Sequence, residues 1–389
     1  MKLVHIADLH LGYRAYHRSD AMGINIREAD VARAFRETLI RAAEIGPDLL
    51  LVAGDVFHTV RPSNAAIADA FRQFARFRAG AEGTRVVIIA GNHDSPRAAE
   101  TGNILRLFEE IPGVHVVHQS ARRLAFPELR AAVLCLPHNE LIGESQPAIE
   151  PEPGVAFNIL LAHAALESAK VRLILDLGVR KLRSDVIDPD EWSYVALGHY
   201  HVPRYTEIAP NMCYSGGIER TSLNIWAEAD QPKGFVEFDL ETGHGTFHEL
   251  ESPRTVIDLP PVQGHGLSAT ELDSAIESSL ASVHEGIEGK IIRLRIFDVP
   301  RDVYRNLDHR KIREYRYSAL HFKLDVRPPA VGRHEGAGAP GHRLSLQEET
   351  VSFLKNRWNP AAGEATRKAV IELAVRYLKE AEEAEALRN

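Results

Sequence analysis

Gly91-Asn92-His93-Asp94 directly follows the apolar run Val86–Ala90, so this motif lies where a buried strand opens into a loop. An amide, an imidazole and a carboxylate side by side can supply a metal ligand, a proton donor and the group that orients that donor. A plain surface turn also accounts for the motif, because Gly, Asn and Asp are common turn residues. The motif is thus either a site for metal and phosphate or a plain surface turn. The other motifs in the chain decide between these two interpretations.

Four more apolar runs end in metal-binding residue types. They are Leu3–Ala7 before Asp8 and His10, Asp48–Ala53 before Asp55 and His58, Ile159–Ala162 before His163, and Tyr194–Leu197 before His199 and His201. Short aliphatic runs without alternation are typical of strands that are covered on both faces. Functional groups gather beyond the carboxyl ends of such strands, so all five loops can converge on one crevice. The sequence therefore predicts a single site built from five strand ends.

The composition is that of a globular protein, with 44% hydrophobic and 26% charged residues, and a length of 389 residues predicts two or three domains. No apolar stretch has the length of a membrane span. Asp8 and His10 would interrupt a signal-peptide core, so we expect a cytoplasmic, nucleoid-associated protein. Cys135 and Cys213 are the only cysteines, which argues against a disulfide framework and a thiolate zinc site. Nineteen histidines favour imidazole and carboxylate ligation instead.

The formal net charge of −8 argues mildly against a protein whose whole surface grips nucleic acid. It does not exclude a nuclease, because carboxylates that bind metal ions count in this total. One basic strip spans Arg301–Lys323. Its basic residues and tyrosines are Arg305, Arg310, Lys311, Arg313 and Arg316, with Tyr304, Tyr315 and Tyr317 between them. A solvated helix face and a nucleic-acid contact both account for this strip.

The pattern of elements divides the chain into an α/β part and a smaller α+β part. Strand-like runs alternate with helix-like ones, such as Glu28–Ile45, up to about residue 250. The next segment predicts strands at Thr255–Leu259, Lys290–Ile296 and His321–Val326, a helix that begins near Ser268, and a basic helix. The predicted parts are 1–252, an α/β domain; 253–327, an α+β domain; 328–344, a flexible Gly/Pro-rich linker; and 345–389, a helical tail.

The tail predicts two amphipathic helices, Ser345–Arg357 and about Ala361–Ala386, with a break at Asn359-Pro360. Their apolar stripes allow packing on the parent domain. Tethering through a flexible linker favours a different acceptor, because an apolar face too small for its own core docks readily on a partner helix or coiled coil.

The order Asp-x-His, Gly-Asp, Gly-Asn-His-Asp, a single His and Gly-His-x-His resembles the calcineurin-like metallophosphoesterase superfamily. More narrowly, the chain resembles the SbcD family of double-strand-break repair nucleases. The motifs that carry this likeness are Ala7–Gly12 followed by Tyr13 and His17, Gly54–His58, and Arg61-Pro62-Ser63. The likeness covers the first domain in its motifs and the later domains only in their layout. It implies a layered α/β sandwich with a small α+β capping domain and a C-terminal helix pair.

By this resemblance, the site holds two divalent cations that activate a water molecule for in-line attack on a phosphodiester. Two neighbouring cations in one site require a carboxylate that bridges them, and Asp55 is the natural bridge. The remaining ligands are expected to be Asp8, His10 and His201 for one ion, and Asn92, His163 and His199 for the other. The mixed oxygen and nitrogen set suits manganese, iron or zinc, with magnesium as a further choice, and the resemblance favours manganese.

His93 has no metal in this scheme, so we expect it to stabilise or protonate the leaving oxygen, with Asp94 orienting its ring. His58 is a further candidate for phosphate stabilisation, although a capped loop histidine explains it too. Tyr13, His17 and Arg61 either line a DNA path or only shape the loops that carry them.

Three functions are compatible with these features. The first is a manganese-dependent DNA exonuclease and endonuclease for double-strand-break repair. The resemblance implies that such a protein is a homodimer within a heterotetramer, and that residues 345–389 bind an SMC-like ATPase of the SbcC type. The second is a stand-alone phosphoesterase that acts on a nucleotide or a phosphoprotein, which would not require the sequence after residue 250. The third, a non-enzymatic DNA or ATPase scaffold, is disfavoured because every expected ligand is present.

Overall fold

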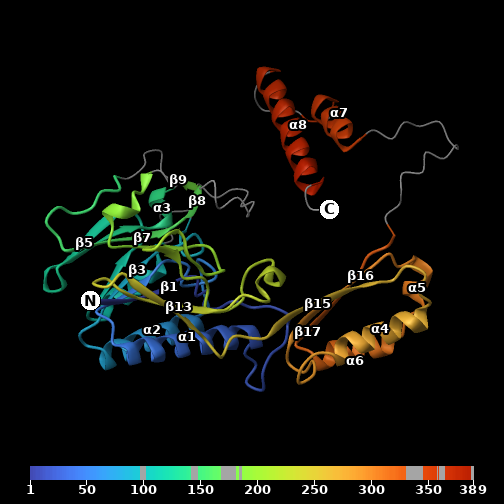
Figure 1. Ribbon diagram of the computed structural model, residues 1–389, viewed down its shortest axis with the longest axis horizontal. Helices are drawn as coiled ribbons and strands as arrows, with labels where there is room; N and C mark the ends of the chain where they lie inside the picture. The colour runs from blue at the N-terminus through green and yellow to red at the C-terminus, as the bar shows by residue number, and fades with distance from the viewer. Residues whose placement is uncertain are drawn as a thin grey trace. The chain divides into compact units, whose positions relative to one another are not determined.

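The computed structural model describes residues 1–96, 102–141, 148–167, 181–183, 186–329, 345–356, 358 and 364–386. The chain forms two compact units, Met1–Pro329 and Ala330–Asn389 (Figure 1). Residues 330–344 of the predicted linker, and the predicted helix break at Asn359-Pro360, lie outside the described residues.

The first sheet has six strands in the order β14-β13-β1-β2-β3-β4. Strands β1 to β4 are parallel, and β13 and β14 pair antiparallel at one edge. Their bounds are β1 Lys2–Ile6, β2 Leu49–Val52, β3 Arg85–Ile89, β4 Val114–Val117, β13 Gly234–Asp239 and β14 His244–Glu249.

The second sheet also has six strands, in the order β11-β12-β10-β7-β6-β5. Its four central strands are parallel, and its two edge strands, β5 and β11, pair antiparallel. Their bounds are β5 Arg122–Phe126, β6 Ala131–Leu136, β7 Phe157–His163, β10 Tyr194–Gly198, β11 Arg204–Ala209 and β12 Met212–Tyr214. A separate parallel pair consists of β8 Ala165–Glu167 and β9 Lys181–Arg183.

The two sheets pack face to face, and alternate residues of each strand supply the two faces. In β2, Leu49 and Leu51 enter the core between the sheets, where they meet Ile159 of β7, while Leu50 and Val52 join the core under the helices. All four β2 side chains are fully buried. The sequence interpretation of these runs as strands covered on both faces is confirmed.

Helices α1 (Ile26–Ile45) and α2 (Asn64–Gly80) lie along the outer face of the first sheet (Figure 1). Helix α1 begins two residues before the predicted start, because the side chain of Asn25 accepts hydrogen bonds from the first backbone N–H groups of the helix. It ends at Gly46, which adopts a left-handed conformation with φ 62°. The other short helical segments of this part are η2 Ile104–Glu110, η3 Pro127–Leu129, α3 His138–Leu141, η5 Pro189–Glu191 and η6 Ile225–Glu228.

The predicted α+β segment folds as a parallel three-stranded sheet, β15-β16-β17, with helices packed on it. Its elements are β15 Val256–Gln263, α4 Ala269–Ala281, β16 Ile291–Phe297, α5 Arg301–Arg305, α6 His309–Ser318 and β17 His321–Val326. The predicted helix start near Ser268 is confirmed, because Ser268 and Glu271 form a reciprocal capping box.

Ion pairs and hydrogen bonds join this segment to the sandwich. The Arg254 guanidinium pairs with the buried Asp30 of α1, and the Arg18 guanidinium donates to backbone carbonyls at the end of α6, including that of Ala319 at 3.2 Å. Both parts belong to the compact unit Met1–Pro329, and the division near residue 252 stays a prediction. The predicted layered α/β class of the fold is confirmed.

The second unit contains α7 (Leu346–Asn356) and α8 (Glu364–Ala386), which contact each other. Leu346 and Phe353 of α7, and Leu373 and Tyr377 of α8, are exposed. Among the residues that the structure describes, none of the helices combines the length and apolar character needed to cross a bilayer. Cys135 and Cys213 are free, buried cysteines.

Candidate metal centre

All five motif-bearing strands present their carboxyl ends to one region, three from the first sheet and two from the second. The loops interlock through the backbone, with the Asp8 N–H donating to the Gly54 carbonyl at 3.1 Å and the His10 N–H to the Asp55 carbonyl at 2.9 Å. Asp8, His10 and Asp55 all have positive φ angles, between 47° and 52°. Non-glycine residues rarely adopt this conformation, and it occurs preferentially at functional sites.

Two motif glycines are required because side chains lie against them. A Cβ atom on Gly91 would stand 2.1 Å from the Asp55 carboxylate, and one on Gly54 would stand 2.4 Å from Nδ1 of His163. Gly54 also has φ +87°. The glycines of the Gly-Asp and Gly-Asn-His-Asp motifs therefore allow the ligand-bearing loops to approach one another closely.

The Asp55 carboxylate lies at the centre of the cluster. Its Oδ2 atom is 3.7 Å from Nε2 of His10 and 3.5 Å from Nε2 of His163. Its Oδ1 atom accepts the backbone N–H of His93 at 2.8 Å, so that oxygen is fixed by the loop. One oxygen of Asp55 therefore faces histidines from both sheets, as a bridging ligand must.

On one side of Asp55, the Nε2 atoms of His10 and His201 lie 3.0 Å apart. The carboxylate of Asp8 accepts the backbone N–H of His199, with both oxygens 3.1 Å from that nitrogen. Potential ligand atoms of Asp8, His10 and His201 all lie within 4.8 Å of one another. Asp8 also forms such a group with Asp55 and His163, so it is close to both halves of the cluster.

On the other side, the Oδ1 atom of Asn92 is 3.0 Å from Nε2 of His163 and 3.3 Å from Nδ1 of His199. Nδ1 of His163 lies 2.8 Å from the Ala53 carbonyl and donates to it, which leaves Nε2 as the acceptor that faces the cluster. Metal-binding histidines are commonly oriented in this way. The structure thus brings all seven predicted ligands into one connected group.

The electrostatics of the cluster fit divalent cations. Burial raises the pKa of Asp55 well above its usual range and that of Asp8 to about 7, while it lowers the pKa of His201 to about 3 and those of His10 and His163 far below the usual value. Neutral imidazoles and closely spaced buried carboxylates form a donor set that a cation stabilises. The residues present therefore fit a pair of transition-metal ions.

His93 lies beside the cluster and is partly exposed. Its ring centroid is 4.8 Å from that of His10, and its Nδ1 donates to the His58 carbonyl at 2.7 Å. In the neutral ring, that bond leaves Nε2 as the nitrogen without a proton. Nδ1 of His58 lies 3.3 Å from Nδ1 of His10, and burial lowers the pKa of His58 to about 4.

The prediction that Asp94 orients the His93 ring is wrong. The Asp94 carboxylate accepts the backbone N–H groups of Val56, Phe57 and Gly91 at 2.9 to 3.1 Å. It therefore joins the Gly-Asp loop to the Gly-Asn-His-Asp loop, and the His58 carbonyl takes the orienting role. The physical reason is geometric, since a buried carboxylate at the base of the loop meets three unpaired backbone donors there.

The three predicted DNA-path residues lie at different places. Tyr13 is half-buried, and its ring packs edge-on against that of His58 with centroids 4.9 Å apart. His17 and Arg61 are exposed on loops, and within the described part of the chain no recorded contact joins either of them to the cluster. Of the predicted basic strip, Lys311 pairs with Glu277 and Arg310 with Glu314.

Three residues near the site were not predicted. His138 follows β6 at the same edge as the other ligands, its ring centroid is 6.3 Å from that of His163, and burial lowers its pKa to about 4. The apolar run before it was the signal that could have found it. Glu228 and Lys233 are also buried beside His201. No local pattern marks these two residues.

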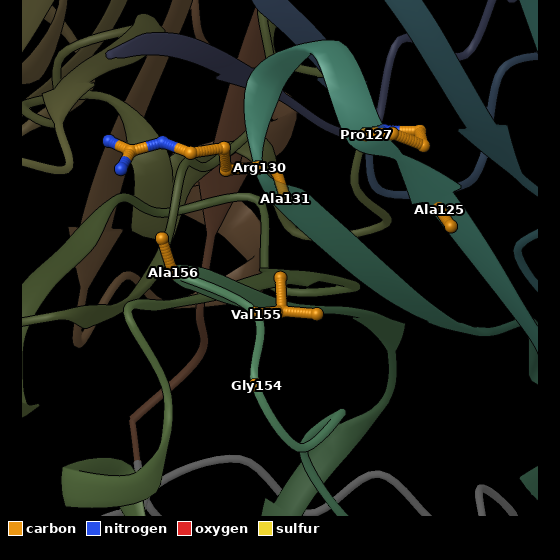
Figure 2. Close-up of a pocket in the computed structure, with 7 residues that line it drawn as sticks. All are labelled: Ala125, Pro127, Arg130, Ala131, Gly154, Val155 and Ala156. Atoms are coloured by element: carbon orange, nitrogen blue, oxygen red, sulfur yellow. The ribbon is translucent and has the colours of Figure 1, made fainter.

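A shallow pocket elsewhere is formed by Ala125, Pro127, Arg130, Ala131, Gly154, Val155 and Ala156 (Figure 2). It lies where β6 begins and beside the start of β7, so it is at the opposite ends of these strands from His163. Its side chains are mostly small and apolar, and it contributes none of the predicted ligands.

A two-sheet sandwich with an aspartate-centred histidine cluster beyond its strand ends defines a metal-dependent phosphoesterase. The family model of the calcineurin-like phosphoesterases matches residues 1–203, and this chain belongs to that family.

Several archaeal relatives carry the name "DNA double-strand break repair protein Mre11". The Methanocaldococcus jannaschii protein is 38% identical over 266 residues, covering 64% of this chain and 66% of its own. The Thermoplasma acidophilum protein is 26% identical and covers 76% of this chain and 73% of its own. The Archaeoglobus fulgidus protein is 27% identical and covers 57% of this chain. The present chain spans about half the length of that last relative, 51%. The resemblance to the family of repair nucleases is confirmed.

Proposed function

We propose that this chain is a manganese-dependent DNA nuclease with exonuclease and endonuclease activity that acts in double-strand-break repair. The observation that carries the proposal is the position of Asp55 Oδ2, which faces His10 on one side and His163 on the other. Such a shared carboxylate oxygen suits two cations, and two-metal sites are characteristic of phosphodiester hydrolysis. The relatives named as double-strand break repair proteins support DNA as the substrate.

In this proposal the chain's own residues hold the ions and position the phosphate. Asp8, His10 and His201 would hold one ion, Asn92, His163 and His199 would hold the other, and Asp55 would be shared. When bound, the two ions activate water and neutralise charge on the phosphate. His93 stands outside the ligand set, and its Nδ1–H donates to the His58 carbonyl. As the doubly protonated imidazolium, it passes the Nε2 proton to the leaving oxygen and is left neutral, with Nδ1 still protonated.

The first test is cleavage of end-labelled double-stranded DNA by the purified full chain. With manganese we expect nucleolysis, and with a chelator we expect none, because the ligands alone cannot activate water. Magnesium and zinc serve as comparison metals. Bis-p-nitrophenyl phosphate is assayed in parallel, because hydrolysis of this small ester without any cleavage of DNA would instead favour the stand-alone phosphoesterase.

We further propose that residues 345–389 bind an SMC-like ATPase, and that the chain is a homodimer within a heterotetramer. The tail supports this because its exposed side chains include Leu346, Phe353, Leu373 and Tyr377 on two contacting helices. An apolar face on a short helix pair suits a helix or coiled coil of a partner.

Replacing Phe353 and Tyr377 together by aspartate is expected to weaken binding of the ATPase coiled coil at least about 100-fold, because large exposed aromatic residues dominate such interfaces. The measurement is calorimetry or pull-down with the full chain. Lys379→Ala is the matched control, since Lys379 is an exposed residue of α8 two positions from Tyr377. Unchanged binding by the double variant would exclude this face as the docking surface.

A further inference from the structure

The His201 imidazole has two different environments. Its Nε2 faces the metal cluster, 3.0 Å from Nε2 of His10. Its Nδ1 is buried, forms no hydrogen bond within the described part of the chain, and lies 3.7 Å from Oε1 of Glu228. A neutral imidazole can bind a metal through Nε2 only if Nδ1 carries the proton. The buried carboxylate of Glu228 is thus the acidic group that faces the nitrogen which must be protonated.

Lys233 connects the same two residues from the other side. Its side chain is 1% exposed, and its Nζ donates to the His201 carbonyl at 2.7 Å and to Oε2 of Glu228 at 2.5 Å. A buried ammonium group is costly unless it is paired and fully hydrogen-bonded. Lys233 therefore fixes both the backbone of His201 and the carboxylate that faces the ring.

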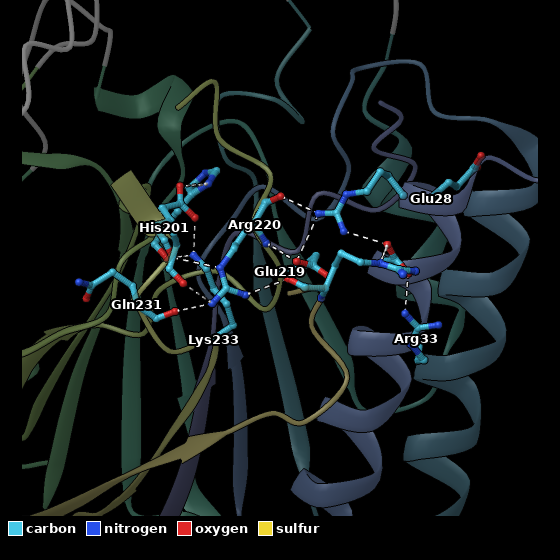
Figure 3. Close-up of polar contacts among 12 residues, drawn as sticks. Glu28, Arg33, His201, Glu219, Arg220, Gln231 and Lys233 are labelled. Atoms are coloured by element: carbon cyan, nitrogen blue, oxygen red, sulfur yellow. Dashed lines mark hydrogen bonds and ion pairs between the residues drawn. The ribbon is translucent and has the colours of Figure 1, made fainter. Parts of the chain in front are cut away.

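The turn that carries Glu228 is itself held in place. The Arg220 guanidinium donates to the carbonyls of Glu228, Ala229 and Gln231 at 2.9 to 3.1 Å (Figure 3). Figure 3 shows His201, Lys233 and Arg220 in one connected group, which continues to Glu219. The backbone of the turn that carries Glu228 is thus fixed by bonds that do not involve the metal ligands.

We propose that Glu228 and Lys233 are positioning residues for the metal ligand His201. Glu228 attracts the Nδ1 proton and so directs the Nε2 lone pair into the cluster. Lys233 fixes the position of Glu228 relative to the His201 backbone. Partners of this kind behind a metal-binding histidine usually contribute a factor of 10 to 100 in metal affinity. The inference rests on the metal centre of the proposed function.

The chain offers a matched control for this arrangement. Glu237 accepts from Nε2 of His248 and from Nζ of Lys2, both at 2.9 Å. This is the same combination of glutamate, histidine and lysine, but it lies on β13, β14 and the first residue of β1, and it includes no predicted ligand. Glu237→Gln therefore removes an equivalent charge without touching the cluster.

The test is manganese calorimetry of the full chain, with thermal unfolding of the same samples in chelator. For Glu228→Gln we expect one of two binding events to weaken about 10- to 100-fold, and for Glu237→Gln both events to match the wild type. If Glu228→Gln keeps both affinities and only lowers the melting temperature, the pair is structural and the inference is wrong. If the wild type itself binds no manganese, the metal centre fails rather than this inference.

A second measurement does not require Glu228→Gln to fold. Side-chain nitrogen NMR of the wild type loaded with diamagnetic zinc reports the histidine tautomers directly. We expect a protonated Nδ1 on His201, assigned by its loss in His201→Gln. A proton on Nε2 of His201, or an Nδ1 signal that exchanges as fast as that of an exposed histidine, would overturn the proposal.

Discussion

Asp55→Asn is expected to weaken manganese binding at both sites by more than about 100-fold and to lower DNA cleavage by a factor on the order of 10³. The expectation follows from the place of Oδ2, which faces His10 and His163 from opposite halves of the cluster. An amide oxygen carries no full charge and is a poor bridge between two cations. Replacing any single-sided ligand should impair one ion more than the other, whereas Asp55 affects both.

The fold should tolerate this change. An asparagine oxygen can still accept the His93 backbone N–H. The change also removes a carboxylate whose ionised form is disfavoured by burial, the same cause that raises the pKa of Asp55. In chelator, the variant should therefore melt no lower than the wild type. Manganese at about 100 times its Kd should stabilise the wild type by about 2.7 kcal/mol for each site and the variant far less.

The matched control for Asp55→Asn is Asp48→Asn. Asp48 stands at the opposite end of the same strand, where its carboxylate accepts the Lys2 backbone N–H at 2.8 Å. Cleavage and manganese affinity should stay at wild-type levels in this variant. Two unweakened manganese binding events in Asp55→Asn would show that Asp55 does not bridge the ions.

The proposed ligand set could be assembled from the sequence because every member lies at or just after the end of one of five apolar strands. The apolar side chains of Leu49 to Val52 are buried in a strand of the sheet. Asp55 therefore lies just beyond the carboxyl end of that strand. The same argument applied to Ala131–Leu136 leads to His138, which was overlooked because Pro137 and a short helix follow the strand. The rule that ligands follow apolar strands thus identifies the edge of the sheet at which the candidate site residues lie.

Roles that depend on contacts between distant segments were not predictable. Asp94 adjoins His93 in sequence, yet its carboxylate bonds to the backbone of Val56 and Phe57 on another loop. Glu228 lies between Ala227 and Ala229, Lys233 directly precedes β13, and both residues contact His201 only in the folded chain. In both cases the partner is chosen by tertiary packing, which no residue pattern within one segment encodes.

The strand arrangement was likewise predictable in part from the sequence. The sequence predicts that five strands deliver ligands to one crevice, but the strands belong to two sheets that face each other, β1 to β3 in one and β7 and β10 in the other. A run such as β10, buried throughout, satisfies either sheet equally well. The assignment depends on which strand edges pair, and local hydrophobicity does not specify that.

His93→Ala is expected to reduce DNA cleavage by a factor on the order of 10² to 10⁴ with manganese binding unchanged. The ring makes one polar contact through Nδ1 to the His58 carbonyl, and it stands beside His10 without belonging to the predicted ligand set. The contact to Asp55 comes from the His93 backbone N–H, which alanine retains. His115→Ala is the control, since His115 is a half-buried histidine of strand β4 that packs on Phe126.

Comparing two substrates shows what His93 does. A DNA sugar leaves as a strongly basic alkoxide and needs a proton, whereas p-nitrophenolate is a stable anion and leaves without one. If His93 is the proton donor, His93→Ala should impair DNA cleavage severely and bis-p-nitrophenyl phosphate hydrolysis only slightly. Equal losses on both substrates would instead assign His93 to stabilising charge on the phosphate, because that charge develops with either leaving group. Full activity on DNA would remove His93 from the mechanism.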